Sequence, residues 1–524
     1  NLNYLVSANA FDRTRSALNS NGSNFAFQGF VNLANAANVA GSENFLRTTQ
    51  MGFVGQIEMD WDSTFYLTVA ARQDYDSRLG VPGREFNAGD FSFVYPAASI
   101  SILLSELLPQ SEALSFAKIR ASWAQVGGPP PFAYLTTSGY GITNVGDGWG
   151  DSLNWPIQGV TGFEIDSVLG NSDLTSELTE EIEFGIDFRF FNNRIGLDLA
   201  YYERQMTDAI LNASLPPSTG YNNVWLNSGR MTGRGVEATL NLGIVESENF
   251  SWNSQINFTS NENIVEELAP GLDKLFLAGF SSGGSYLIAG NQYGALVGGA
   301  YLRSGNGGPG DDGLNIPDGD VVINDDASSN EYGFQAVDPQ QRAIGNPNPD
   351  FILGWNNQIR LGPVNIGFLF DWKEGGDMLN GVGWALSFFG RSQLTADTRN
   401  EAPAPIPGVL PDGSPNNIPV VRDQYYYQSS VGGFGSVWEQ FTDDAGWIRL
   451  REVSLGYNIP VSSIGIDFID SANLSIVGRN LWYSTDYNGV DPETSLTGVG
   501  NGQGVDYFNM PGTRSVLAKL KLNL

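Results

Sequence analysis

The feature that most constrains this chain is a set of segments, each roughly ten residues long, in which apolar and polar residues alternate. The clearest is 181–190, where five apolar side chains alternate with polar residues or glycine, and 195–201 repeats the pattern after Asn192-Asn193. Alternation with period two places the apolar residues on one face of a β-strand. An Asn-Asn pair tolerates the positive φ angles of a tight turn. These segments are therefore predicted to form an antiparallel hairpin with one apolar face.

The same alternation predicts strands along the rest of the chain. They are expected at residues 1–10, 53–61, 65–71, 91–103, 116–125, 236–242, 252–258, 351–359, 364–372, 447–458, 472–483 and 514–524. Short strands are also expected within the long loop 263–350, near residues 285–303. Residues 11–50 are rich in Asn, Ser and Ala and are interpreted as a loop, with one strand near 25–33.

The connections between these segments alternate between very short ones, at Ser63, Asn193 and Pro363, and very long ones. Short turns at one end of the strands and long loops at the other are typical of an outer-membrane barrel. A soluble propeller is the competing interpretation, but it would repeat every ~40–50 residues, and the spacing here is irregular. The predicted fold class is all-β, a transmembrane antiparallel β-barrel with its apolar face toward lipid and its polar face toward a wet lumen.

Two features of the C-terminal segment bear on how such a barrel is built. In residues 516–524 apolar residues alternate with Lys519, Lys521 and Asn523, and a closed barrel would pair this strand instead of leaving an edge. Its closing partner is expected upstream of Asn1. In residues 447–457 the apolar positions change from even to odd, which predicts either a β-bulge or an end of the strand that rises above the lipid.

Composition excludes several classes of function. The 524 residues carry 57 acidic and 27 basic side chains, a net charge of −30, which argues against a nucleic-acid partner. The chain has no Cys and no His, so thiolate chemistry and the commonest general base are absent. No nucleophile–base motif is visible either, and we therefore expect a protein that is not an enzyme. No apolar run is long enough for a transmembrane helix, and no signal peptide is seen at Asn1.

Loop aromatics are the first candidates for a binding site, because aromatic rings can stack on sugars or grip a peptide. The candidate substrate-binding residues are Trp149, Trp155, Tyr425, Tyr426, Tyr427 and Trp438. The alternative is that these rings belong to a membrane-interface girdle or pack the loops on themselves.

The acidic loop 310–326, GDDGLNIPDGDVVINDD, is the candidate metal site, through Asp318, Asp320 and Asp326. Hard cations such as Ca²⁺ bind several carboxylate oxygens on a tightly turning chain. The spacing of an EF-hand is not met, so a solvated acidic loop is the alternative and no other cofactor is expected.

Several motifs resemble those of the SusC/RagA-type TonB-dependent transporters of Bacteroidetes outer membranes. They are NSDLTSELTEEIEFGIDFRFF (171–191), NNRIGLDLAYY (192–202), LPPSTGY (215–221), the GVE core of 233–242, IGNPNPDF (344–351), WIRLREVSLGY (447–457), GRNL (478–481), YNGVDPE (487–493) and YFNMPGTR (507–514). Their order and spacing cover nearly the whole chain from about residue 52.

The resemblance implies a 22-stranded barrel in the cell outer membrane, filled by an N-terminal plug and capped by a SusD-like surface lipoprotein. It also implies TonB-driven import of oligosaccharides or peptides. No plug or TonB box is visible in this sequence, so residues 1–524 are expected to be the C-terminal part of the barrel domain, without the plug and the first strands. Two alternatives remain: a structural subunit of a larger outer-membrane assembly or secretion complex, and a passive porin or adhesin.

Overall fold

The computed structural model describes residues 1–85, 87–109, 111–142, 144–145, 153–155, 157, 160–305, 314–429, 437–461 and 469–523. The chain divides into two compact units. The first holds residues 1–102, 120–183 and 204–230, and the second holds residues 103–119, 184–203 and 231–524. Among the described residues, no helix combines the length and the apolar character needed to cross a membrane.

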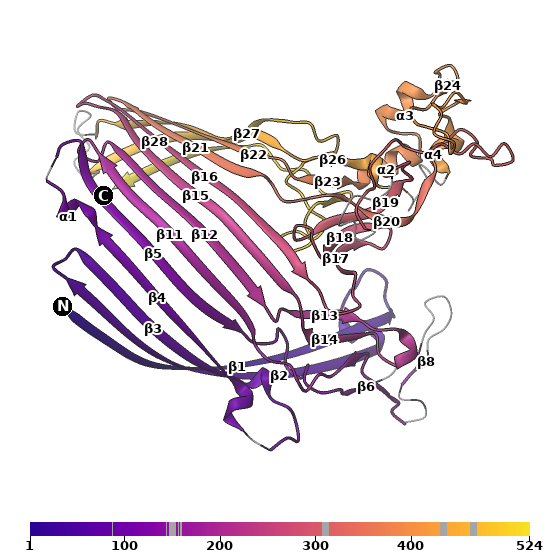
Figure 1. Ribbon diagram of the computed structural model, residues 1–524, viewed down its shortest axis with the longest axis horizontal. Coiled ribbons are helices and arrows are strands. Elements are labelled where there is room, and N and C mark those ends of the chain that lie inside the picture. Colours follow the sequence, from indigo (N-terminus) through magenta and orange to yellow (C-terminus); the bar gives the residue numbers. More distant parts are fainter. Residues whose placement is uncertain are drawn as a thin grey trace. The chain divides into compact units, whose positions relative to one another are not determined.

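The dominant element is a 14-stranded sheet in the order β1-β2-β3-β4-β5-β11-β12-β15-β16-β21-β22-β27-β28-β30 (Figure 1). Its strands are β1 (Leu2–Phe25), β2 (Ala36–Trp61), β3 (Phe65–Asp76), β4 (Ser92–Leu103), β5 (Leu114–Gly128), β11 (Glu177–Phe190), β12 (Ile195–Thr207), β15 (Arg230–Glu246), β16 (Phe250–Glu267), β21 (Phe351–Leu361), β22 (Val364–Glu374), β27 (Trp447–Ile459), β28 (Ser471–Thr485) and β30 (Ser515–Asn523). The predicted all-β class and antiparallel sheet are confirmed.

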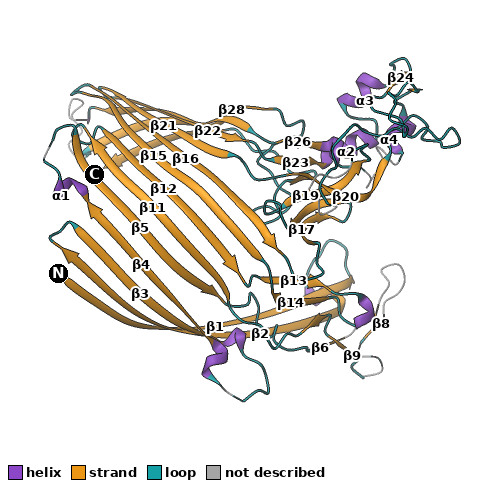
Figure 2. Ribbon diagram, in the orientation of Figure 1, coloured by secondary structure: helices purple, strands orange, loops and turns teal. Residues whose placement is uncertain are grey.

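Smaller elements lie in the connections, and Figure 2 shows that the helices are short and confined to them. The small sheets hold β6 (Tyr140–Ile142), β7 (Asn144–Val145), β8 (Leu153–Asn154), β9 (Phe163–Ile165), β10 (Val168–Leu169), β13 (Ile210–Ser214), β14 (Asn223–Asn227), β17 (Lys274–Phe280), β18 (Gly283–Ile288), β19 (Ala295–Tyr301), β20 (Val337–Gly345), β23 (Asp377–Asn380), β24 (Ala404–Pro405), β25 (Pro419–Val420), β26 (Thr442–Asp444) and β29 (Val505–Asp506). The α-helices are α1 (Leu104–Leu107), α2 (Gly381–Phe388), α3 (Gln393–Thr398) and α4 (Gln424–Gln428). The 3-10 turns are Leu33–Asn35, Ser77–Leu79, Ala88–Phe91, Pro217–Thr219 and Glu439–Phe441.

The connections alternate in length as predicted. Only residues 62–64 separate β2 from β3, and only Gly362-Pro363 separates β21 from β22. By contrast, residues 268–350 separate β16 from β21, and residues 375–446 separate β22 from β27. Successive strands are antiparallel, so the short turns share one end of the strands and the long loops share the other.

The register of β1 to β4 aligns apolar residues into continuous rows. One row runs Tyr4, Ile57, Val69 and Ala98, because Tyr4 pairs with Ile57, Ile57 with Val69, and Val69 with Ala98. Tyr4, Ile57 and Val69 are exposed, which suits a face that meets lipid. The neighbouring position Glu58, in register with Thr68, belongs to the opposite, polar face.

The interpretation of residues 11–50 as a loop is wrong. Strand β1 continues to Phe25 and β2 begins at Ala36, and their residues pair without interruption from Leu2–Met59 to Ser23–Asn38. The polar composition misled the prediction, since a two-stranded ribbon satisfies its backbone hydrogen bonds by pairing and needs no apolar face to do so.

The change of phase in β27 is a β-bulge, one of the two predicted alternatives. Leu369 of β22 pairs with Glu452 and Phe370 with Leu450, so Arg451 is an extra residue. On the other side Glu452 pairs with Arg479 and Leu450 with Trp482, which leaves Asn480 and Leu481 of β28 opposite Arg451. Asn480 has a φ of 53°, in the left-handed region that Asn tolerates better than most residues.

The long loops of the second unit form an apolar core. Leu296, Leu379, Trp384, Trp438, Phe441 and Val505 are buried together. These six residues come from the loops 268–350, 375–446 and 486–514. The three loops therefore fold as one packed body and not as independent flexible segments.

Candidate functional site

Trp438 is the most deeply buried of the predicted binding aromatics. It is 0% exposed, and its ring lies 4.5 Å from that of Trp384 and stacks on Phe280 at 6.3 Å, measured between centroids. A Cβ placed on Gly283 would come within 2.5 Å of the indole Nε1, so only glycine fits there. Its burial favours the alternative that this ring packs the loops on themselves.

Tyr426 and Tyr427, on α4, are also buried, in a second cluster with Tyr301 and Phe334. The Tyr427 hydroxyl lies 2.9 Å from the Thr398 hydroxyl, and the Tyr426 hydroxyl donates to Gln335 Oε1 at 3.1 Å. Burial raises the pKa of Tyr426 and of Tyr301, so both phenols stay protonated. These rings serve loop packing and offer little surface to a substrate.

The remaining predicted aromatics differ in their accessibility. Tyr425, next to the buried pair, is 47% exposed and is available to a ligand. Trp155 is half-buried, and its indole nitrogen has no hydrogen-bond partner within the described part of the chain. Trp149 lies outside the described residues. The predicted set is therefore not brought together as one surface, and a substrate role remains a proposal for Tyr425 and Trp155.

The three aspartates of the predicted metal site do not converge in the structure. Throughout the described ranges, no group of three or more acidic side chains is placed to hold a metal ion. Asp326 accepts hydrogen bonds from the backbone nitrogen and hydroxyl of Ser328, at 2.9 and 2.6 Å, and these bonds lower its pKa. Asp318 and Asp320 are exposed, and residues 306–313 of this loop lie outside the described residues. Calcium binding stays a prediction for this loop.

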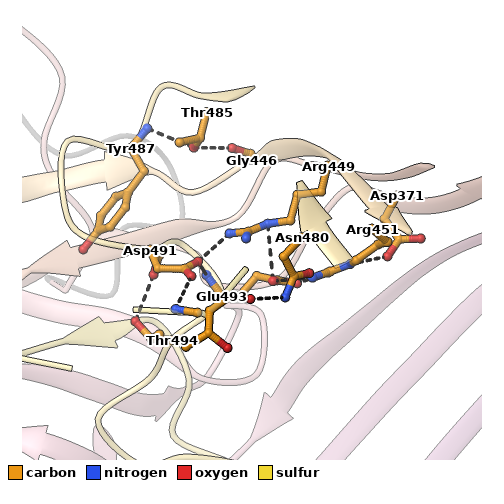
Figure 3. A network of polar contacts seen from close by, with 12 residues as sticks. Asp371, Gly446, Arg449, Arg451, Asn480, Thr485, Tyr487, Asp491, Glu493 and Thr494 are labelled. Carbon is orange, nitrogen blue, oxygen red and sulfur yellow. Dashed lines mark hydrogen bonds and ion pairs between the residues drawn. The ribbon is translucent and has the colours of Figure 1, made fainter. Parts of the chain in front are cut away.

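A network of arginines and carboxylates joins the wall strands to the loop after β28, and sequence reasoning did not single it out (Figure 3). Arg449 and Asp491 form a buried ion pair, and Arg449 Nε lies 3.3 Å from Glu493 Oε2. Arg451, the bulged residue of β27, donates to Asp371 Oδ2 at 2.5 Å and to both carboxylate oxygens of Glu493. One loop is thus held by two adjacent arginines of the wall.

Aromatic rings and backbone amides complete the surroundings of this network. The Arg449 guanidinium lies 5.1 Å from the ring of Trp447 and 4.6 Å from that of Tyr483. Asp491 also accepts backbone hydrogen bonds from Glu493 and from Gly512, at 3.1 and 3.0 Å. Burial alone would raise the pKa of Asp491, but these amide donors and Arg449 outweigh it and lower the pKa. The carboxylate is therefore held in its charged form.

A second polar group fixes the same loop at Tyr487. Its hydroxyl donates to Asp506 Oδ2 at 2.7 Å, and its backbone nitrogen donates to the Thr485 hydroxyl at 3.1 Å. That hydroxyl in turn donates to the Gly446 carbonyl at 2.6 Å. Burial raises the pKa of both Tyr487 and Asp506, so the phenol remains a donor. The loop is therefore anchored at several points.

Six of these anchoring residues come from the motifs WIRLREVSLGY, YNGVDPE and YFNMPGTR: Trp447, Arg449, Arg451, Tyr487, Asp491 and Glu493, with the Gly512 amide beside them. Asp371, Thr485 and Asp506 lie outside the motifs. Part of the site was thus present in the sequence as a resemblance, although nothing in the sequence shows that these motifs meet. Long antiparallel strands with short turns at one end and anchored, folded loops at the other define the class of outer-membrane β-barrel receptors.

Comparison with known proteins specifies this class further. A family model described as TonB dependent receptor-like, beta-barrel, matches residues 3–337. TonB-dependent receptor P3 of Formosa agariphila is 26% identical over 525 residues, which cover 94% of this chain and 47% of the relative. TonB-dependent receptor SusC of Bacteroides thetaiotaomicron is 26% identical over 234 residues, 43% of this chain and 22% of the relative.

Among solved structures, the chain resembles one described as the RagAB peptide transporter. The TM-score is 0.74 at 18% identity, over 99% of this chain and 53% of that one, and this likeness concerns the fold alone. The chain belongs to the TonB-dependent receptor β-barrel family, and its resemblance to the SusC/RagA type is confirmed. It is a protein of the cell outer membrane and spans about half the length of the curated relatives it matches. Those relatives are named as receptors and not as enzymes.

Proposed function

We propose that the protein containing this chain imports oligosaccharides or peptides across the outer membrane with energy supplied through TonB. The observation that carries this proposal is the family match over residues 3–337, most of the strands of the sheet. The relatives are named TonB-dependent receptors, and the RagAB structure is described as that of a peptide transporter. In this proposal residues 1–524 supply strands of the barrel wall and the loops above them.

The partner we propose is a SusD-like surface lipoprotein that covers the long loops. The loops of the second unit share an apolar core, and the last of these loops is anchored to β27 by a buried ion pair. Such a preorganised loop surface loses little conformational entropy when a partner docks on it. Acidic loops and a net charge of −30 would favour a partner that presents basic residues.

Deletion of the gene in its native host tests import directly. Uptake of fluorescently labelled oligosaccharides and peptides is measured in the wild type, the deletion strain and the complemented strain, with and without a proton-motive-force uncoupler. We expect uptake of one substrate class to be lost on deletion and on uncoupling. Uptake that survives the uncoupler would indicate a passive porin instead.

Affinity purification of the full-length protein tests the partner and the second alternative together. A single stoichiometric lipoprotein is the expected result. Stoichiometric secretion or assembly subunits, with unchanged uptake in the deletion strain, would instead indicate a structural subunit of a larger complex.

A further inference from the structure

The loop between β22 and β27 contains a cavity of about 460 Å³ that none of the predicted sites includes as a whole. Its walls come from the end of α2 and the turn that follows, from α3 and Arg399, and from α4 and the two residues before it. Figure 2 labels the three helices. The helices are held together by side chains: Gln428 Nε2 donates to the Phe388 carbonyl at 3.2 Å, and the hydroxyls of Thr398 and Tyr427 lie 2.9 Å apart. The cavity thus belongs to a packed part of the loop.

The charge of this cavity is opposite to that of the protein. Arg391, Arg399 and Arg422 all line it, although the whole chain has only 27 basic residues and a net charge of −30. Three guanidinium groups on one small cavity repel one another unless an anion lies between them. The arrangement therefore favours an anionic ligand.

Glu401 and Asp423 offset part of this positive charge, and within the described residues Arg391 and Arg399 are left without a carboxylate partner. Arg399 Nη2 donates to the neutral Gly390 carbonyl at 2.8 Å, and for Arg391 the described part of the chain shows no side-chain partner. Arg422 pairs through Nη2 with Glu401 at 2.6 Å. Asp423 is the acidic residue of the lining, and its Oδ1 accepts from the backbone nitrogens of Tyr425 and Tyr426, at 2.9 and 3.2 Å.

The rest of the lining suits a sugar ring. Five side chains with hydroxyl or amide groups line the cavity: Ser387, Thr395, Gln424, Tyr427 and Gln428. The amides of Gln424 and Gln428 are exposed, whereas the other three side chains are buried and their hydroxyls are bonded within the loop. Phe389 also lines it and is 66% exposed, which leaves its ring open to stacking on the apolar face of a sugar. Guanidinium groups bind planar carboxylates through paired hydrogen bonds.

We propose that this cavity binds an acidic oligosaccharide through the carboxylate of a uronic acid residue. Arg391 and Arg399 contact the carboxylate, the exposed amides of Gln424 and Gln428 contact the sugar hydroxyls, and Phe389 stacks on the ring. The inference deepens the proposed import function, on which its biological role rests, by assigning a substrate class to one site on the loops. Binding itself needs neither TonB nor transport.

Isothermal titration of the full-length receptor purified in detergent tests the proposal. The probes are trigalacturonic acid, the neutral trigalactose of the same length, and an acidic tripeptide. We expect the acidic sugar to bind at least about tenfold more tightly than either of the others, and its affinity to fall as salt is raised. Equal affinity for the neutral sugar, or tighter binding of the tripeptide, would overturn the proposal.

Variants localise the binding. Arg391→Gln removes a guanidinium that is not used in packing and is expected to weaken trigalacturonate binding about tenfold. Phe389→Ala should weaken it as well, since the exposed ring supplies stacking. Arg84→Gln, at an exposed arginine of another loop, is the matched control and should leave the affinity unchanged. If Arg391→Gln binds as the wild type does, the cavity is not the site, whatever the uptake experiment shows about import.

Discussion

Arg449 and Asp491 form an ion pair whose side chains are only 5% and 8% exposed, and this pair joins strand β27 to the loop between β28 and β30. Removing one partner of a buried pair leaves the other charge without compensation, at a cost of about 3–5 kcal/mol. We therefore expect Arg449→Met to destabilise this loop strongly. Hydrogen exchange of residues 486–514 in the full-length receptor measures the loss.

An exposed pair in the same sheet is the matched control for this variant. Arg479 and Glu452 are bonded at 2.9 Å with side chains 57% and 36% exposed, and such pairs contribute about 0–1 kcal/mol. Arg479→Met should change the exchange of the loop little. The double variant Arg449→Met/Asp491→Leu should recover part of the lost protection, because no charge remains buried. Equal losses in the two single variants would contradict the anchoring role.

Asp506 gives the loop a dependence on pH opposite in sign to that of Asp491. Burial raises the pKa of Asp506 above its ordinary value of 3.8. Protonation of Asp506 therefore stabilises the folded state fully below pH 3.8, and this stabilisation is lost as pH rises through the raised pKa. Asp506→Asn keeps an acceptor for the Tyr487 hydroxyl and should remove this loss. Thermal unfolding followed by tryptophan fluorescence from acidic to neutral pH should show a flatter profile for the variant.

The control for this experiment is Asp326→Asn. The hydrogen bonds from Ser328 lower the pKa of Asp326 below 3.8, so its contribution is present above that value and is lost as pH falls through the lowered pKa. Asp326→Asn should therefore change the slope of stability against pH only below pH 3.8. An Asp506→Asn variant with the wild-type slope would show that this carboxyl does not titrate in the range.

Substitutions at Trp438 and Tyr425 distinguish a residue that packs the loops from one that is available to a ligand. Trp438 is fully buried, so Trp438→Ala should cost about 3–5 kcal/mol through the cavity it leaves. Tyr425 is 47% exposed, so Tyr425→Ala should cost about 0.5 kcal/mol or less. Urea unfolding of the full-length receptor followed by fluorescence compares the two. Similar stabilities for both variants would mean that the loop core contributes little to stability.

Two adjacent residues of β2 test which face of the sheet meets lipid. Ile57 lies in the apolar row and is 51% exposed, whereas Glu58 belongs to the polar face. Arginine on the lipid face costs about 2–4 kcal/mol at the middle of the bilayer, so Ile57→Arg should reduce the folded fraction in outer membranes. Glu58→Arg should be tolerated. Folding is measured by heat-modifiable migration on gels. A lower folded fraction for Glu58→Arg than for Ile57→Arg would show that the two faces are assigned the wrong way round.

The strands of the sheet could be predicted because period-two alternation is a local property of the chain. Ile182 to Phe190 show it without interruption, and the structure places them in β11. The extension of β1 and β2 through residues 11–50 could not be predicted, since a polar ribbon carries no alternation. These residues form strands because β1 and β2 pair with each other.

The candidate sites depended on contacts between segments far apart in sequence. Arg449 and Asp491 are 42 residues apart, and neither shows from its local sequence that the other is its partner. Trp438 is buried by Phe280 and Trp384, which belong to other parts of the long loops. The aromatic composition of a loop therefore predicts that rings are available, but only the fold decides which of them face inward.

The extra residue at Arg451 limits how a chain of this kind can change in length. If β27 alternated strictly with all its residues in place, Arg449 would lie on the same side as Leu455 and Tyr457, which are exposed. The extra residue puts Arg449 on the opposite side. Loss of Arg451 would restore strict alternation and keep Arg449 on that side, but it would remove the contacts of Arg451 with Asp371 and Glu493. The long loops do not alternate between two faces, so a change in their length reverses no side chain. A longer loop also adds little to the entropy of closure. Insertions and deletions can therefore reshape the binding surface, whereas in β27 a change of one residue has to be matched by the gain or loss of a bulge.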